Sequence, residues 1–351
     1  MPQSHIKMLK FSIIIPIYNT AQFIGRCVDS CIKQSYSNIE IICVDDCSTD
    51  NSKDILSSFQ NKDNRIKCIF HSRNESQYMA RLNGFSQATG DYILFLDSDD
   101  TIRIDACDLI AKQINDDQPD IVQFGYREIP GGRKVFSPFY STSKERILGY
   151  LARENRYSPE VWTKAYKRSV IASASGIMEG FFSSCSEDLY TSIVFTYFAK
   201  TYSFLKKPLV NYSTDTGWSK KKDYSLQTYA QWLSSYTAVI QKTHAFINQY
   251  IPEFSVNCPD MEFYSLKNFL YNRLPQDLSP ELKCRFFEIL PSYFSNNTIY
   301  SLFDEFLVKS YKYDKYFDFN VSFLSKTKKL LLLFLLYLKS FLVKNHADIQ
   351  K

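Results

Sequence analysis

Short, continuously apolar runs alternate with amphipathic segments through the first hundred residues of this chain. Four runs have the length of strands that are covered on both faces: residues 11–17, 39–44, 65–70 and 92–96. Three segments between them carry apolar residues at helical spacing: residues 21–34, a segment that Asp50 or Ser52 can cap, and residues 77–89. This alternation predicts an α/β fold with a parallel sheet and right-handed crossovers.

Beyond residue 105 the pattern is less regular. A mixture of short strands and helices, with a clear turn at 130–132, gives way near residue 226 to helical segments rich in aromatic residues. We therefore expect three parts: an α/β domain over residues 1–225 with halves 1–105 and 106–225, a helical region over 226–325, and a tail over 326–351.

The tail carries lysines on both sides of an apolar run. Lys326, Lys328 and Lys329 precede the run at 330–338, and Lys339 and Lys344 follow it. The run is about half the ~20 residues that a spanning helix needs. These features predict a helix that lies in the interface of an anionic membrane. The alternative is a helix that packs against the domain or in a homodimer.

Composition and charge narrow the class of protein. The chain has 351 residues, of which 45% are hydrophobic and 23% charged, as in ordinary globular proteins. A net charge of +5 over this length argues against nucleic-acid binding. Nine cysteines without an extracellular spacing pattern, and no signal peptide, predict reduced thiols and a cytoplasmic protein. With the tail, this predicts peripheral attachment to the inner face of the cytoplasmic membrane.

Carboxylates cluster at two of the predicted strand ends. Asp45 and Asp46 end the second strand, and Asp97, Asp99 and Asp100 follow the fourth. The carboxyl ends of parallel strands meet at one edge of the sheet, where α/β proteins bind ligands. Such a cluster needs a cation, and hard oxygen ligands without His or Cys suit Mg²⁺ or Mn²⁺. The alternative is that these turns only cap helices.

Phosphate-binding loops of other kinds are missing from the sequence. No Gly-x-x-x-x-Gly-Lys-Ser/Thr loop is present, and no Gly-x-Gly-x-x-Gly follows the first strand. A P-loop NTPase is therefore excluded, and a dinucleotide-dependent oxidoreductase is disfavoured. What remains is a metal-bound nucleotide diphosphate that acts as a leaving group.

Several motifs together resemble the family 2 glycosyltransferases with a GT-A fold, of the type that builds bacterial surface glycans. They are FSIIIPIYNT, IEIICVDDCSTDNS, NGFSQATGDYILFLDSDD, VWTKAYKRSVI and SEDLYTSIVF, which cover roughly residues 10–220 in the family's order. The resemblance implies a GT-A Rossmann-like, mostly parallel sheet flanked by helices, with a mainly helical C-terminal region.

The resemblance also implies how the donor is bound. Pro16, Tyr18 and Asn19 map to the loop that lines the nucleotide pocket. Asp46 maps to the residue that accepts a hydrogen bond from the base, and Arg81 to a basic residue near the base and phosphates.

The metal site and the base follow from the same resemblance. Asp97 and Asp99 form the DxD motif, in which Asp97 faces the ribose and metal and Asp99 ligates the metal that bridges the diphosphate. Asp188 maps to the general base and Glu187 to its neighbour, although Glu-Asp is also an ordinary helix start. Trp162 would wall the sugar pocket, with core packing as the alternative.

The resemblance also bears on a loop over the diphosphate and on the number of sugars that are added. Ser219 and Lys220 lie where the family closes a loop over the diphosphate, although a solvated lysine fits as well. Two positions depart from the family pattern, with Cys47 in place of a glycine and Leu82 in place of an asparagine. Residues 227–232 lack the arginine of the processive synthases, which favours the addition of a single sugar.

Together these features predict an inverting, metal-dependent glycosyltransferase. It would move a hexose or N-acetylhexosamine from a UDP-sugar to a hydroxyl of a glycan or lipid-linked oligosaccharide. The pathway would be surface polysaccharide, lipopolysaccharide or glycoprotein glycan synthesis. Two alternatives are a nucleotidyltransferase that acts on a sugar phosphate and a non-catalytic nucleotide-sugar binder.

Overall fold

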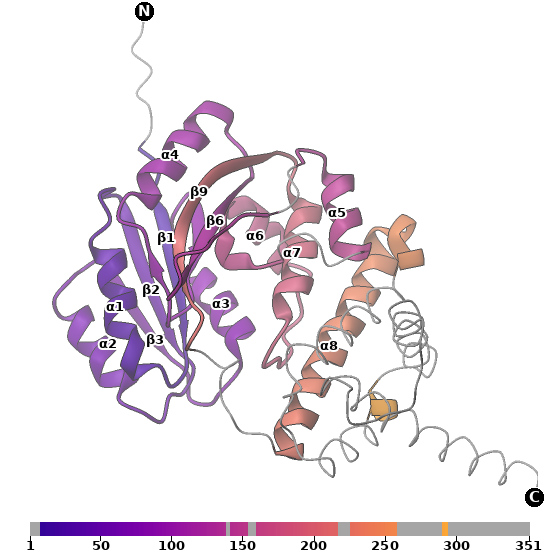
Figure 1. The fold of residues 1–351 in the computed structure, drawn as a ribbon, viewed down its shortest axis with the longest axis horizontal. Helices are drawn as coiled ribbons and strands as arrows, with labels where there is room; N and C mark the ends of the chain where they lie inside the picture. Colours follow the sequence, from indigo (N-terminus) through magenta and orange to yellow (C-terminus); the bar gives the residue numbers. More distant parts are fainter. Residues whose placement is uncertain (1–7, 138–140, 154–158, 217–224, 258–289, 294–351) are drawn as a thin grey trace, which may run out of the picture. The chain divides into compact units, whose positions relative to one another are not determined.

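A computed structural model describes residues 8–137, 141–153, 159–216, 225–257 and 290–293. The chain divides into two compact units, of which the first comprises residues 1–221 and 238–257 and the second residues 222–237 and 258–351. The helix α8 (Leu226–Tyr250) contributes residues to both units. The candidate site lies in the first unit, whose described part is shown in Figure 1.

The first half of this unit is a parallel sheet, as predicted. Its strands pair in the order β3-β2-β1-β4, and their bounds are β1 (Phe11–Ile17), β2 (Ile39–Asp45), β3 (Ile66–Phe70) and β4 (Tyr92–Phe95). Ile17 is paired with Asp45, and Ile14 with Phe95. The strands therefore end at a common edge, and the loops that follow them start close together.

The sheet continues as a mixed sheet. Beyond β4 the order is β8-β6-β9-β5, with bounds β8 (Lys164–Lys167), β6 (Ile121–Ile129), β9 (Tyr202–Ser213) and β5 (Thr101–Ile102). β7 (Lys134–Val135) forms a hairpin with β6 around the predicted turn at 130–132. The predicted parallel pairing holds for β1–β4 and recurs between β6 and β9, whereas β8 is antiparallel to both β4 and β6 and makes the sheet mixed.

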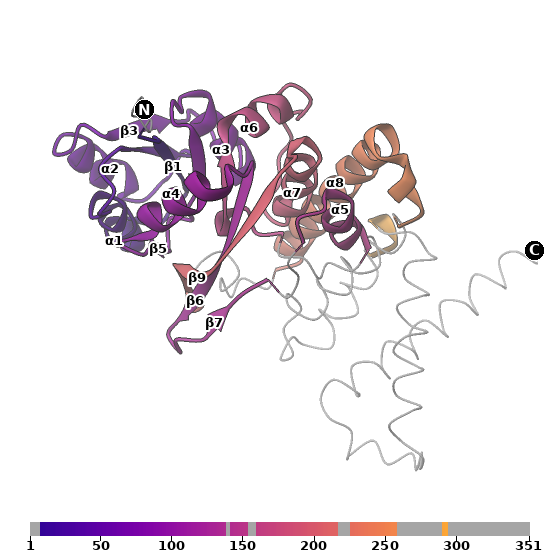
Figure 2. The ribbon, with the colours of Figure 1, turned by 90° about the horizontal axis from the view of Figure 1, so that it is seen from above.

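Helices cover both faces of the sheet (Figures 1 and 2). On one face lie α1 (Ala21–Ile32), α2 (Ser52–Gln60) and α4 (Ala106–Asp117). Their buried side chains share a core with alternate residues of β1, such as Ile13 and Ile15. α3 (Gln77–Ser86) packs on the opposite face, where Gly84 approaches Ile14 so closely that a Cβ would lie 2.5 Å from its Cγ2.

The other described helices follow the acidic loop after β4 in sequence. They are α5 (Lys144–Arg153), α6 (Arg168–Ser175), α7 (Glu187–Phe198) and the short 3₁₀ turns Val161–Thr163, Pro252–Asn257 and Leu290–Ser292. Two predicted helices are shorter than expected, since those predicted at 21–34 and 77–89 end at Ile32 and Ser86. Each described cysteine is a free thiol.

The predicted tail at 326–351 lies outside the described residues. Within the part that is described, no helix combines the length and the hydropathy that crossing a bilayer requires.

Candidate functional site

The loop after β1 is tied to the loop after β2. Asn19 adopts a left-handed backbone conformation with φ 53°, and its side-chain oxygen accepts hydrogen bonds from the backbone N–H of Thr49 at 2.7 Å and of Asp50 at 3.3 Å. Its own backbone N–H donates to the hydroxyl of Ser48 at 3.0 Å. Asn19 therefore joins the two loops, and its amide oxygen is already engaged.

The other residues predicted in these loops differ in exposure. Pro16 is buried inside β1, whereas the ring of Tyr18 is 39% exposed beside the sheet edge. Cys47, which replaces the family's glycine, has a φ of 62°. The left-handed turn is thus retained by a residue with a Cβ, at a conformational cost that a glycine would avoid.

Asp46 lies just after β2 with 2% of its surface exposed. Its Oδ1 accepts hydrogen bonds from the backbone N–H of Glu75 at 2.7 Å and lies 2.8 Å from Nδ1 of His71, and its Oδ2 accepts from the N–H of Ser76 at 2.8 Å. A carboxylate has about four acceptor positions, so one position on Oδ2 is left. The backbone of residues 75 and 76 thus orients this carboxylate directly before α3.

The acidic loop after β4 is held by groups from three other elements. Oδ1 of Asp97 accepts hydrogen bonds from Nε2 of Gln77 at 2.7 Å and Nη2 of Arg81 at 2.9 Å. Oδ2 of Asp99 accepts from the hydroxyl of Thr216 at 3.0 Å. Arg26 donates to the backbone oxygen of Asp99 at 2.6 Å. Each carboxylate of the DxD motif therefore keeps one oxygen without these bonds.

Asp100 completes the acidic cluster from inside the protein. It is buried, its Oδ1 accepts a hydrogen bond from the N–H of Ser213 at 2.7 Å, and its Oδ2 has no partner. Burial raises the pKa of Asp100 to about 9, and the charges of Asp97 and Asp99 add to the rise. Burial and Asp97 likewise raise the pKa of Asp99. This loop thus gathers more negative charge than its surroundings balance.

The donor set fits a hard divalent cation. The oxygens available on Asp97 and Asp99, beside the unpartnered Oδ2 of Asp100, match the preference of Mg²⁺ and Mn²⁺ for carboxylate oxygen. Within the described residues no set of three or more His, Cys, Asp or Glu side chains forms a complete cage. Mg²⁺ usually takes one or two carboxylates and completes its shell with water and substrate phosphates.

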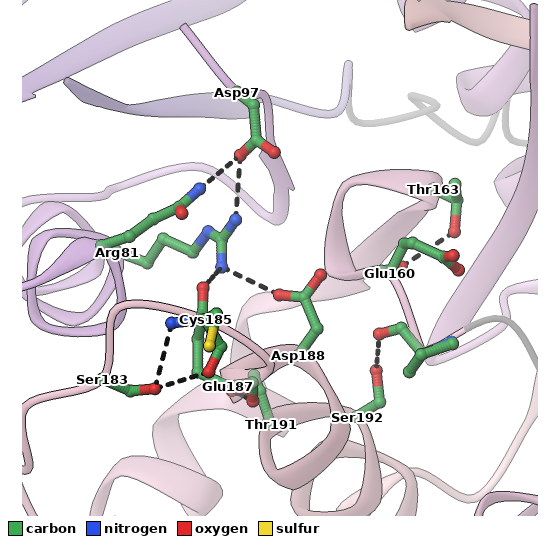
Figure 3. Close-up of polar contacts among 12 residues, drawn as sticks. Arg81, Asp97, Glu160, Thr163, Ser183, Cys185, Glu187, Asp188, Thr191 and Ser192 are labelled. Carbon is green, nitrogen blue, oxygen red and sulfur yellow. Dashed lines mark hydrogen bonds and ion pairs between the residues drawn. The ribbon is translucent and has the colours of Figure 1, made fainter. Parts of the chain in front are cut away.

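Arg81 links the acidic loop to the start of α7 (Figure 3). Its Nη2 lies 2.9 Å from Oδ1 of Asp97, and its Nη1 lies 2.9 Å from both Oε1 of Glu187 and Oδ1 of Asp188. The guanidinium is almost completely buried among these three carboxylates. One fixed cation therefore orients the first residue of the DxD motif and the predicted general base together.

Asp188 is the more accessible carboxylate of the Glu-Asp pair. Its side chain is 21% exposed, and only its Oδ1 is engaged by a described residue. Burial raises the pKa of Asp188 to about 7, Arg81 opposes this rise, and Glu187, Asp97 and Glu160 add to it. A carboxylate with a pKa near neutrality and a free oxygen is suited to act as a general base.

A buried lysine, Lys164, interacts electrostatically with Asp188. Lys164 donates to the backbone oxygen of Glu160 at 2.7 Å and is almost completely enclosed. Burial lowers the pKa of Lys164 to about 8, while Glu160 and Asp188 act in the opposite direction. Among the residues that the structure describes, Arg81 and Lys164 are thus the buried cations that balance the carboxylates around α7.

Trp162 differs from the expected sugar-pocket wall. It stacks on Tyr212 with centroids 5.2 Å apart and planes at 5°, and Tyr126 meets its ring edge-on at 5.0 Å. Only 6% of its surface is exposed, and it belongs to the main hydrophobic core. The alternative that we considered, core packing, therefore describes Trp162 better, because almost no ring face is left for a pyranose.

Several contact residues were not predicted from the sequence. Gln77 could have been found, because it precedes Arg81 by four positions and shares its face of α3. His71 carried no local signal, since its partner Asp46 is distant in sequence. Thr216, the partner of Asp99, begins the stretch 216–221 that the resemblance places over the diphosphate, but no contact was assigned to it. The predicted residues Ser219 and Lys220 lie outside the described residues.

Known proteins share both the sequence motifs and the fold. Residues 12–174 match the profile of the family described as "Glycosyl transferase family 2". "Glycosyltransferase GlyG" from Streptococcus pneumoniae is 38% identical over 141 residues, which cover 40% of this chain and 46% of that protein. "Putative glycosyltransferase EpsH" from Bacillus subtilis is 32% identical over 208 residues, or 57% and 60% of the two chains. The chain thus spans about half of the length of these relatives.

The solved structures agree on the fold. A crystal structure of S. aureus TarS in complex with UDP-GlcNAc superposes with a TM-score of 0.61 at 21% identity, and covers 81% of this chain and 80% of that one. At this identity the likeness establishes the fold alone. Residues 12–174 of the chain therefore match glycosyl transferase family 2, and the chain shares a GT-A-like fold with TarS.

Proposed function

We propose that this protein is an inverting, divalent-cation-dependent glycosyltransferase that moves one hexose or N-acetylhexosamine from a UDP-sugar to an acceptor hydroxyl. The observation that carries the proposal is the position of Arg81, which contacts both Asp97 of the DxD motif and Asp188 at the start of α7. A donor-binding carboxylate and a carboxylate with a raised pKa thus face one another across a single guanidinium. TarS, which binds UDP-GlcNAc in its crystal, supports a UDP-sugar as donor.

The chain's own groups suit each part of this reaction. The free oxygen of Asp188 would accept the proton of the acceptor hydroxyl, while Arg81 keeps the carboxylate in place through its other oxygen. Asp46 would accept the N3–H of uracil, and Tyr18 would lie beside the nucleotide at the sheet edge. Attack on the anomeric carbon from the face opposite the diphosphate inverts its configuration.

Asp97 and Asp99 would hold Mn²⁺ or Mg²⁺ through the oxygens that Arg81, Gln77 and Thr216 leave open. Such an ion neutralises charge on a leaving diphosphate. The raised pKa values of Asp99 and Asp100 support this role, since a nearby cation favours the ionised carboxylates.

A donor screen tests the proposal directly. The protein would be incubated with Mn²⁺ and a panel of UDP-hexoses, UDP-N-acetylhexosamines and the corresponding GDP-sugars, and release of the nucleoside diphosphate would be measured. We expect hydrolysis or transfer with at least one UDP-sugar, and little with GDP-sugars. Failure to release UDP from every member of the panel, with the protein folded, would contradict the proposed function.

The acceptor and the location form a second part of the proposal. The names of the relatives include a "Putative teichuronic acid biosynthesis glycosyltransferase" from Bacillus subtilis, which supports a glycan or lipid-linked acceptor in surface-polysaccharide, lipopolysaccharide or glycoprotein glycan synthesis. In this view residues 1–225 form the catalytic domain, residues 226–325 a helical region, and residues 326–351 attach the enzyme to the inner face of the cytoplasmic membrane.

Vesicle binding tests the proposed role of the tail. Five lysines flank its apolar run, and each contributes about 1 kcal/mol near an anionic surface. A protein that ends at residue 325 should lose sedimentation with anionic vesicles and retain UDP-sugar hydrolysis. If the shortened protein instead unfolds or no longer forms a homodimer, and the full-length protein does not bind vesicles, the tail packs against the rest of the protein or in the dimer.

A further inference from the structure

His71 lies directly after β3, with its side chain 7% exposed, and contacts the carboxylate that the proposed function assigns to the nucleotide base. Its Nδ1 is 2.8 Å from Oδ1 of Asp46. Its Nε2 is 3.0 Å from Nδ2 of Asn83, on the adjacent helix α3. The imidazole is therefore held at both ring nitrogens by side chains from two different elements.

The contacts of Asn83 indicate which ring nitrogen of His71 carries the proton. The amide nitrogen of Asn83 also donates to Oε2 of Glu75 at 3.4 Å, so the amide presents its N–H groups on this side. An N–H group can only donate, so Nε2 of His71 must accept. The proton of the neutral ring then resides on Nδ1, where it is donated to Asp46.

This donation completes the set of protein donors around Asp46. The N–H of Glu75 and the imidazole occupy Oδ1, and the N–H of Ser76 occupies one position on Oδ2. Three donors keep the carboxylate oriented, and one acceptor position remains. Two of these donors are backbone groups, so among the described residues His71 is the side chain that adds to the orientation and can be tested by substitution.

We propose that His71 is a specificity-determining positioning residue: through its hydrogen bond it aims the last acceptor position of Asp46 at the N3–H of uracil. The inference rests on the proposed function, because it presumes a uridine nucleotide in this pocket. Cytosine has an acceptor at N3 in place of the uracil donor. A rigidly held acceptor therefore favours uracil and rejects cytosine, whose N3 would face the carboxylate without a proton.

Binding of UDP and CDP to full-length variants, measured by calorimetry in Mn²⁺, tests this role. The wild type should prefer UDP. His71→Phe keeps a ring but has no donor, and should lower UDP affinity about tenfold while CDP affinity changes little. His71→Asn places an amide nitrogen near the position of Nδ1 and should keep UDP affinity within about threefold of the wild type. His244→Phe, the same exchange in α8, should change neither affinity.

Two further measurements separate positioning from simple loss of structure. His71→Phe should raise the KM for the UDP-sugar and leave kcat at saturating donor close to the wild-type value. Asn83→Ala keeps the imidazole but removes the bond that selects its tautomer, and should lower UDP affinity about threefold.

The possible results distinguish the inference from the proposed function. A wild type that binds neither nucleotide, or prefers CDP, would overturn the proposed donor and the inference with it. A wild type that prefers UDP, with the same preference in His71→Phe and Asn83→Ala, would overturn the role of His71 alone.

Discussion

Nη1 of Arg81 lies 2.9 Å from Oδ1 of Asp188, while Nη2 of the same guanidinium lies 2.9 Å from Oδ1 of Asp97. The two carboxylates belong to different elements, one to the loop after β4 and the other to the first turn of α7. A single buried guanidinium therefore positions the proposed base and Asp97 together, and it shares the balance of charge at the base with Lys164.

Removal of this cation should shift the pH dependence of transfer. Arg81 opposes the burial that raises the pKa of Asp188 to about 7, so Arg81→Gln should raise that pKa further. A general base works in its ionised form, and activity is lost as pH falls through its pKa. The acidic limb of the pH profile of kcat should therefore move to higher pH in Arg81→Gln. The shift should be smaller in Arg81→Lys, which keeps the positive charge. An unmoved limb in both variants would show that Asp188 does not limit the rate.

Asp188→Asn should separate catalysis from binding. The change preserves volume and removes the ability to accept a proton, so kcat should fall about 10²- to 10⁴-fold. UDP affinity should stay within a few-fold of the wild type, because Asp188 has no proposed contact with the nucleotide. The measurements are single-turnover transfer and UDP calorimetry. Near-normal transfer in Asp188→Asn would assign the base to another group.

Asp99→Asn should weaken cation binding while the fold is kept. The substitution removes a charge from the acidic loop at nearly constant volume, and Thr216 can still donate to the amide oxygen. We expect Mn²⁺ affinity to fall at least tenfold, measured by calorimetry with UDP present, and thermal stability to stay equal or rise because repulsion is relieved. As a control, a chelator should abolish the activity of the wild-type enzyme, and added Mn²⁺ or Mg²⁺ should restore that activity.

The sequence predicted the sheet edge well because its signals are local. The buried strands are continuous apolar runs, and the carboxylates that follow β2 and β4 are adjacent in sequence to those runs. Parallel pairing then brings the loops to one edge without further information. The same reasoning could not show that β8 joins the sheet antiparallel, because the sequence of this four-residue strand does not indicate in which direction it pairs.

The network around the site was less accessible to prediction. Arg81 meets Asp97, Glu187 and Asp188 across sequence separations of 16, 106 and 107 residues. Whether Trp162 packs or binds sugar depends on Tyr212, which stacks on it from β9. Such contacts depend on the tertiary structure, so residue type alone could suggest the roles but not decide between them.

Glu40, near the start of β2, should contribute to the stability of the fold in a way that depends on pH. Burial alone would raise its pKa, but hydrogen bonds from Ser12, Thr89 and Lys67 outweigh burial and lower the pKa to about 2. The unfolded chain then binds a proton more readily than the folded one, so stability falls as pH drops from about 4.5 towards 2. The charged form contributes about 3 kcal/mol to the free energy of unfolding above that window.

Urea unfolding of wild type and Glu40→Gln at several pH values measures this contribution. The variant should be less stable near neutral pH, and the difference should narrow as Glu40 in the wild type becomes protonated. A difference that stays constant from neutral pH down to the acid limit would contradict the ionised state of Glu40.

Two helical glycines should respond to alanine with opposite signs. At Gly84 in α3, a Cβ would lie 2.5 Å from Cγ2 of Ile14 and 3.1 Å from Cγ2 of Val44. Both side chains are buried and β-branched, so their χ1 angles cannot easily change to make room. Gly84→Ala should therefore lower the free energy of unfolding by about 1–3 kcal/mol. At Gly25 in α1, nothing lies within 4 Å of the added Cβ, so Gly25→Ala should raise that free energy by about 0.5–1 kcal/mol through helix propensity. Urea titration of both variants decides the matter: stabilisation at Gly84 would mean that α3 does not pack against β1 and β2 as closely as the structure has it.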